Sequence, residues 1–106
     1  MAEDALKDVL PFAIGHDRAD FRKRIAGKAL GPDGIWRSAA EEEQLNTLFN
    51  RAFSTESGRE VLKHLKQITL ARVCGPEATE AQLRHIEGQR FLVSVILNRI
   101  ERGKGK

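Results

Sequence analysis

The segment FLVSVILNRI, residues 91–100, restricts the possible folds more than any other part of the chain. Its apolar residues surround about two thirds of a helix, which is more apolar surface than a helix with one solvent-facing side carries. Such a helix lies either at the centre of a bundle or in a contact shared with another copy of the chain. In both cases it is the core helix. For the shared contact, the residues that we expect between copies are Phe91, Val95 and Ile100.

The rest of the chain reads as helices separated by proline and glycine. These two residue types gather at residues 10–15, 30–34 and 74–76, which is typical of connections between helices. No stretch alternates between apolar and polar residues with a period of two. We therefore predict an all-α fold, a small bundle of about four helices, with a single domain over residues 1–100 and a flexible basic tail over 101–106. The expected helices cover residues 3–10, 17–30, 38–73 (as one helix or as two that meet near residue 54) and 79–100.

Helix starts are marked by a serine or threonine followed three residues later by Glu or Gln. Three pairs match this pattern: Ser38 with Glu41, Ser57 with Glu60, and Thr79 with Gln82. The helix that begins at Ser38 is either continuous with the next one or broken near Ser54. That next helix is expected to stop at Gly75 and Pro76.

Two glycines lie where helix faces are apolar. Gly58 falls within the apolar arc of its helix, and Gly88 shares a stripe with Leu92 and Val95. Glycine inside a helix costs about 1 kcal/mol relative to alanine. The missing Cβ would offset that cost if two backbones cross closely there. The alternatives are a loose first turn at Gly58 and a later helix start at Gly88.

Composition points to a soluble globular chain of one domain, with 106 residues, 41% hydrophobic and 31% charged. The single cysteine, Cys74, cannot form an internal disulfide and suits a reducing cytosol. The N-terminal sequence resembles neither a signal peptide nor a membrane span, so we expect no membrane contact. The sequence pI of about 9.4 permits contact with nucleic acid without requiring it.

Positive charge gathers on the predicted second helix and at the C-terminus. Mobile cations of this kind can bind DNA phosphates without reading sequence, or bind an acidic protein. The alternative is a solvated helix face with a solubilising tail. No aromatic residues interleave with the tail, which argues against stacking on single-stranded nucleic acid. The candidate contact residues are Arg18, Arg22, Lys23, Arg24, Lys28, Arg102, Lys104 and Lys106.

No residue pattern predicts catalysis, a metal or a cofactor. The candidate ligands and nucleophiles, which are His16, His64, Cys74 and His85, lack the close pairs of a zinc site. The segment LGPDG lacks the lysine of a phosphate-binding loop and reads as a turn. We therefore expect a protein that is not an enzyme.

Two short motifs, in residues 53–65 and 85–96, carry a family resemblance. Over residues 45–100 the chain resembles a family of small tailed-phage proteins named after a protein of a Bordetella temperate phage. Residues 1–40 have no counterpart, so the basic helix is an addition to the family pattern. The matching residues are Phe53, Thr55, Gly58, Arg59, Val61, Leu62 and Leu65, then Glu87, Gly88, Gln89, Arg90, Leu92 and Val93.

The resemblance implies a phage or prophage origin, a place among virion or head-assembly proteins, and no assigned enzymatic activity. Within the second motif, Glu87 lies three residues from both Arg84 and Arg90. This spacing is typical of a surface ion-pair ladder, and the alternative is a polar cluster that binds a partner.

Together these observations predict a small helical protein of virion assembly or DNA packaging. It would bind phage structural or packaging proteins, possess a non-specific DNA contact, form a homo-oligomer, and reside in the bacterial host cytoplasm or the virion. The alternative function is a helix-turn-helix DNA-binding regulator. Residues 72–82 have about the right length for its turn, but the helix that follows is apolar where base-reading residues are needed.

Overall fold

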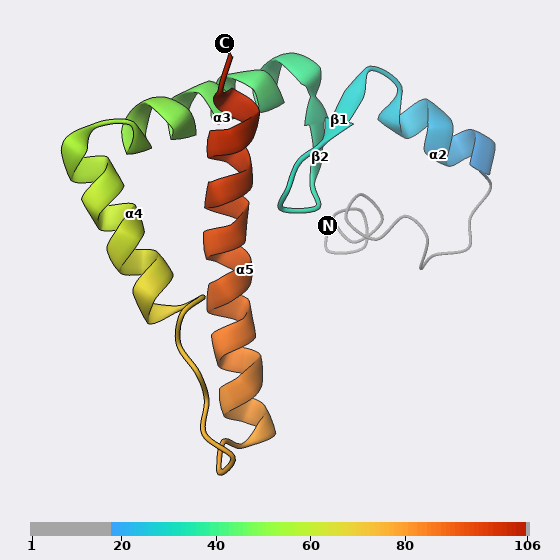
Figure 1. Ribbon diagram of the computed structural model, residues 1–106. Helices are drawn as coiled ribbons and strands as arrows, with labels where there is room; N and C mark the ends of the chain where they lie inside the picture. Colours follow the sequence, from blue (N-terminus) through green and yellow to red (C-terminus); the bar gives the residue numbers. More distant parts are fainter. Residues whose placement is uncertain (1–17, 106) are drawn as a thin grey trace. The chain divides into compact units, whose positions relative to one another are not determined.

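The computed structural model describes residues 18–105, which are mostly helical and include one short two-stranded sheet (Figure 1). The described residues divide into two compact units, one ending at residue 44 and the other beginning at residue 45, and helix α3 (Ala39–Phe53) contributes residues to both. The predicted helical character is confirmed, but the fold is not purely all-α because of the sheet. The helix expected at residues 3–10 lies outside the described residues. None of the described helices is long and apolar enough to cross a bilayer.

The first unit contains a hairpin where a longer helix was predicted. Helix α2 (Arg18–Ile25) ends just before Gly27, whose φ of 74° is a left-handed conformation that glycine adopts without strain. Strands β1 (Lys28–Leu30) and β2 (Trp36–Ser38) then pair antiparallel, with Ala29 opposite Arg37. The prediction of helix through residue 30 is therefore wrong beyond Ile25, because three-residue strands are too short to show a period of two. LGPDG is a turn, as predicted, but it joins strands.

The start of α3 follows its sequence signal, whereas the start of α4 (Glu56–Ile68) does not. The Ser38 hydroxyl accepts a hydrogen bond from the Glu41 main-chain N–H at 3.1 Å. Helix α3 then breaks around Ser54, which settles the alternative that the sequence left open. The cap of α4 is Thr55, whose hydroxyl accepts from the Gly58 N–H at 2.9 Å, and not the predicted Ser57.

Helix α4 ends earlier and helix α5 (Glu80–Gly103) ends later than the sequence indicated. The last residue of α4 is Ile68, so the glycine and proline at 75–76 lie within an irregular connection over residues 69–79. At the start of α5 the predicted pair is a complete capping box: Gln82 N–H donates to the Thr79 hydroxyl, and Thr79 N–H donates to the Gln82 side chain. Helix α5 continues to Gly103, so the residues from 101 to 103 are helical and not part of a flexible tail.

Helix α5 provides the apolar core of the second unit. Among the described residues, the buried apolar side chains are Ile86, Val93 and Val95, all on this helix. At its C-terminal end, a Cβ on the buried Gly103 would collide with the Asn46 main-chain oxygen and would lie 2.8 Å from the Asn50 Cβ. The bare backbone of α5 therefore packs against α3 (Figure 1). The predicted core helix is confirmed.

Candidate binding surface

The first family motif forms the corner between α3 and α4. A Cβ on Gly58 would collide with the Ala52 carbonyl oxygen and would come within 2.8 Å of the Phe53 Cα. The Arg59 guanidinium reaches back and donates to the Ser54 carbonyl at 2.8 Å. Gly58 thus lies in the first turn of α4 beside its cap, which was the alternative to a helix crossing, and the backbone that comes close to it is the last turn of α3. Together with the Thr55 cap, these contacts set the direction in which α4 leaves the corner.

The second motif forms the corner between α4 and α5. Arg90 donates through Nε to the Thr69 carbonyl at 3.0 Å and through Nη2 to the Arg72 carbonyl. Its Nη1 pairs with Glu87 at 3.0 Å. Both carbonyls lie just beyond Ile68, at the start of the connection, where the regular hydrogen bonds of α4 have ended; the Thr69 carbonyl also accepts from the Arg72 main-chain N–H at 3.3 Å. Arg90 therefore ties the end of α4 to the middle of α5.

The other polar residues near this corner make local contacts along α5. Arg84 lies 3.9 Å from Glu80, so the expected ladder through Glu87 contains one rung, to Arg90. The Gln89 side chain lies 3.2 Å from the His85 ring. The motif thus acts within the chain, chiefly through Arg90, and this is a structural role that spacing alone did not reveal.

Helix α4 is held at both ends but has no buried residue of its own. Leu62 and Leu65, the motif leucines, are partly buried. Val61 is 53% exposed and Ile68 is 46% exposed. These two residues lie seven positions apart and so share one side of the helix. We call them the α4 flank. The α4 flank is thus a small, half-exposed apolar surface on an amphipathic helix.

Helix α5 also exposes apolar residues, and the three residues predicted to contact another copy differ in their exposure. Val95 is only 8% exposed and belongs to the core, Ile100 is partly buried, and Phe91 is 56% exposed. Leu92 is 61% exposed, although the core interpretation placed it inside. Gly88 is exposed, and a Cβ there would meet nothing within 4 Å. The close crossing predicted at Gly88 is therefore wrong within a single chain.

A hollow of about 620 Å³ lies between the connection and the first turns of α5. Its apolar lining includes Val73, Ala81 and Ile86, and its polar lining includes Arg72 and His85. Cys74 also lines it. No three His, Cys, Asp or Glu side chains in the described part of the chain are grouped to hold a metal ion, and His16 lies outside that part.

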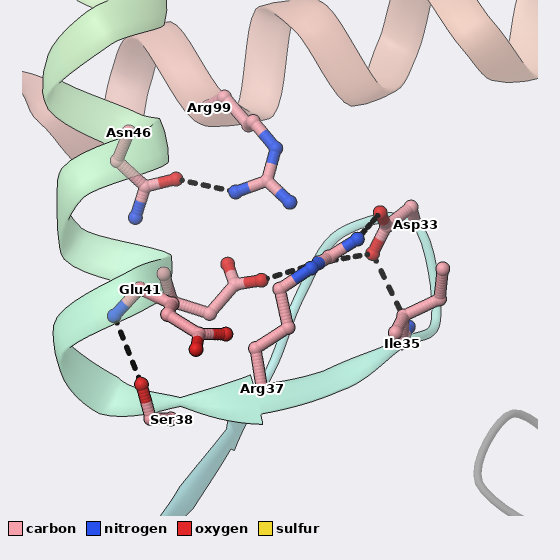
Figure 2. Close-up of polar contacts among 8 residues, drawn as sticks. Asp33, Ile35, Arg37, Ser38, Glu41, Asn46 and Arg99 are labelled. Atoms are coloured by element: carbon pink, nitrogen blue, oxygen red, sulfur yellow. Dashed lines mark hydrogen bonds and ion pairs between the residues drawn. The ribbon is translucent and has the colours of Figure 1, made fainter.

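Two buried polar groups were missed by the sequence reasoning. The first is Arg99, 2% exposed, which donates to the Asn46 Oδ1 at 3.0 Å (Figure 2). Its guanidinium also lies over the Phe49 ring, 5.7 Å from the ring centroid. The Asn50 amide donates to the Ile100 carbonyl at 3.0 Å beside it. The sequence alone predicts an exposed side chain for an arginine within a charged C-terminal segment. Its burial becomes visible only from its partners on α3, some fifty positions earlier in the chain.

The second group braces the hairpin. Arg37 pairs with Asp33 at 2.6 Å and with Glu42 at 2.6 Å, and Glu42 is 3% exposed (Figure 2). The hydrogen bond to Asp33 raises the pKa of the Arg37 guanidinium above its usual range, against burial, which lowers it. Gly31 lies so close that a Cβ there would come 2.9 Å from Arg37. An aspartate in the turn and an arginine on the next strand were the available signals. This cluster shapes the hairpin and leaves no open ligand site of its own.

The predicted cationic residues are divided between two separate segments. The cations at 22–24 occupy the last turn of α2 and are exposed, and Lys28 is exposed on β1. Arg102 is exposed on α5, and the Lys104 ammonium pairs with Glu101 at 2.9 Å. Arg18 is the first residue of α2. Lys106 lies outside the described residues.

The described part of the chain is thus a small, mostly helical protein in which two arginine-containing motifs fix two helix corners. A family model of Bbp19-like phage proteins matches residues 49–104, which are over half of the 106 residues. The chain belongs to this family of phage proteins, and the resemblance is confirmed. The matched segment includes both corners and leaves out the basic α2. No curated protein and no solved structure gives a significant match.

Proposed function

We propose that this phage protein takes part in virion assembly or DNA packaging by binding another phage protein through the α4 flank. The observation that carries the proposal is that α4 is anchored at both ends by Arg59 and Arg90 yet buries none of its residues. Holding a helix in a fixed place has a cost in conformational entropy, and the chain itself covers only about half of the flank residues Val61 and Ile68 to offset it. A partner that covers Val61 and Ile68 supplies that burial.

The partner chemistry follows from the flank and its surroundings. Burying two half-exposed aliphatic side chains stabilises a complex by about 1–3 kcal/mol in total, which is modest. The exposed cations Lys63 and Lys66 lie on another side of α4 from Val61 and Ile68, so the contact at the flank is apolar. The proposed partner is therefore a phage structural or packaging protein that presents apolar side chains to the flank. Binding of this kind requires no catalytic residues, and we propose none.

A DNA contact is a second proposed activity, supported by the exposed cations at residues 22–24 in the last turn of α2. Three adjacent cations suit contact with phosphates and carry no means of reading base sequence. The helix-turn-helix alternative receives less support from the geometry. That motif joins its helices with a turn of about 3–4 residues, whereas residues 69–79 separate α4 from α5.

The test is complementation of the phage with this gene disabled. The variant Val61→Glu/Ile68→Glu places two charges on the flank and should fail to restore DNA-filled, infectious particles. The control Lys63→Glu/Gln67→Glu changes two exposed residues on another side of α4 and should restore them. Circular dichroism of each purified variant checks that the helices remain.

Three outcomes would argue against the proposal. Normal infectious particles from the disabled phage would remove the role in assembly. Full rescue by the flank variant would remove the flank as the contact. A fall in late transcripts, with particle assembly normal once structural proteins are supplied from a plasmid, would favour the regulator.

A further inference from the structure

One stripe along α5 changes from covered to open at Leu92. Val95, three positions further along this stripe, is 8% exposed, whereas Leu92 is 61% exposed and the preceding Gly88 exposes bare backbone. Phe91, next to Leu92, is 56% exposed. Two large apolar side chains thus lie beside a glycine on the helix that also provides the core. This stripe shares no residue with the α4 flank, so the inference goes beyond the proposed function.

Just before Leu92, the same helix provides a hole for a side chain of that size. When two helices pack, a side chain from one inserts among residues i, i+3, i+4 and i+7 of the other. On α5 these positions are Ala81, Arg84, His85 and Gly88, and all four are exposed. Ala81 and Gly88 are small, which leaves the hole open. Ala81 and His85 also border the hollow beside the connection, whereas Arg84 and Gly88 are not part of its lining.

We propose that a second copy of this chain covers this stripe, with the two α5 helices antiparallel and crossing at Gly88. In such a pair, the residue n positions after Gly88 in one copy faces the residue n positions before Gly88 in the other copy. Leu92, four positions after, faces Arg84, four before, and so enters the hole between residues 81 and 88. The pair has two-fold symmetry, so each copy supplies one inserting side chain and one hole.

The charged residue at the hole also suits this pairing. Arg84 is 84% exposed in its side chain, and its 3.9 Å contact with the 89% exposed Glu80 stabilises little. In the antiparallel pair the aliphatic part of Arg84 lies along Leu92 of the second copy. Its guanidinium then reaches the exposed ring of the neighbouring Phe91, an attraction between a cation and an aromatic face. The contact therefore places no cation against a like charge.

The spacing identifies the occupant as another copy and sets its direction. To bind a different helix, α5 needs only a hole or an inserting side chain. To bind a second copy of itself across a two-fold axis, it needs both, at equal distances on either side of one residue. A parallel pair would place Leu92 against Leu92 and leave both holes empty. The contact covers about four helical turns, which is small for a stable interface, so association is expected in the micromolar range.

The experiment is analytical ultracentrifugation of the full chain from about 1 to about 300 µM, which brackets micromolar association. The wild-type mass should rise from that of the 11.9 kDa monomer towards twice that value. Leu92→Glu should remain monomeric throughout with an unchanged helical spectrum. The matched control, Leu83→Glu, changes another exposed leucine on α5 outside the hole and should dimerise like the wild type. A wild type that stays monomeric, or a Leu92→Glu variant that dimerises normally, would overturn the proposal.

Cross-linking then tests the crossing point and the direction in a Cys74→Ser background. Gly88→Cys should form a disulfide-linked dimer on mild oxidation, because the two residues meet at the symmetry axis. Arg84→Cys should not, because the antiparallel arrangement separates its two copies by about 12 Å along the helices, at 1.5 Å per residue. Cα atoms more than about 7 Å apart cannot be bridged. Equal cross-linking of both variants would indicate a parallel pair and would refute the arrangement, and a Gly88→Cys variant that stays unlinked would refute the crossing point.

Discussion

Two glycines of helix α5 should respond in opposite directions to the same substitution. A Cβ at Gly88 meets nothing within 4 Å, so Gly88→Ala changes only the conformational preference of the helix. Alanine should then raise the free energy of unfolding by about 0.5–1 kcal/mol. At Gly103 the added Cβ collides with the Asn46 main chain, which cannot rotate away as a flexible side chain would. Overpacking of this kind costs about 1–3 kcal/mol, which exceeds the preference for alanine near a helix end.

The two variants should therefore differ in stability by about 1.5–4 kcal/mol, the sum of the two estimates. Urea unfolding followed by circular dichroism measures this difference, since a slope of about 1–3 kcal/mol per molar urea separates the midpoints by about 0.5 M or more. The measurement belongs at low protein concentration, where the proposed dimer is dissociated. If Gly103→Ala is as stable as the wild type, or if both variants shift in the same direction, the close packing of α5 on α3 is wrong.

Three further predictions concern arginines and lysine. Arg90→Ala should destabilise the chain by about 1–3 kcal/mol, because it removes charged donors from two main-chain carbonyls, and it should speed hydrogen exchange in residues 69–79. Arg90→Lys should restore only part of the lost stability, since an ammonium lacks the planar fork of a guanidinium. Arg99→Ala should cost about 3 kcal/mol or more in urea unfolding, whereas Arg99→Met, which keeps the volume without the charge, should cost less. Equal losses would show that the loss comes from the guanidinium and its bond to Asn46, which both variants lack, and that the buried volume matters little. If α2 touches DNA, gel shifts should show weak binding that depends steeply on salt and is indifferent to sequence. Changing the cations at 22–24 to alanine should reduce the dependence of the binding constant on salt by up to about three phosphate contacts. The absence of retarded DNA at low salt would reject the contact.

The sequence by itself determined those features whose causes lie within a few residues. The capping box at Thr79 needs only a side chain three positions away, and the Ser38 cap is equally local. The apolar circumference of residues 91–100 was enough to identify the core helix. The two motifs in their order were enough to indicate the phage family, because a family pattern requires no three-dimensional information.

The tertiary structure decided everything that depends on a distant partner. Arg90 bonds the Thr69 carbonyl, just beyond Ile68, from 21 positions away. Helix α4 ends at Ile68, well before the glycine and proline at 75–76 that were expected to stop it. Spacing made Gly58 and Gly88 look alike, but backbone lies against Gly58 and nothing lies against Gly88. The burial of Arg99 likewise depends on a helix some fifty positions earlier in the chain. A local pattern gives the face on which a residue lies, whereas burial depends on which distant atoms come to that face.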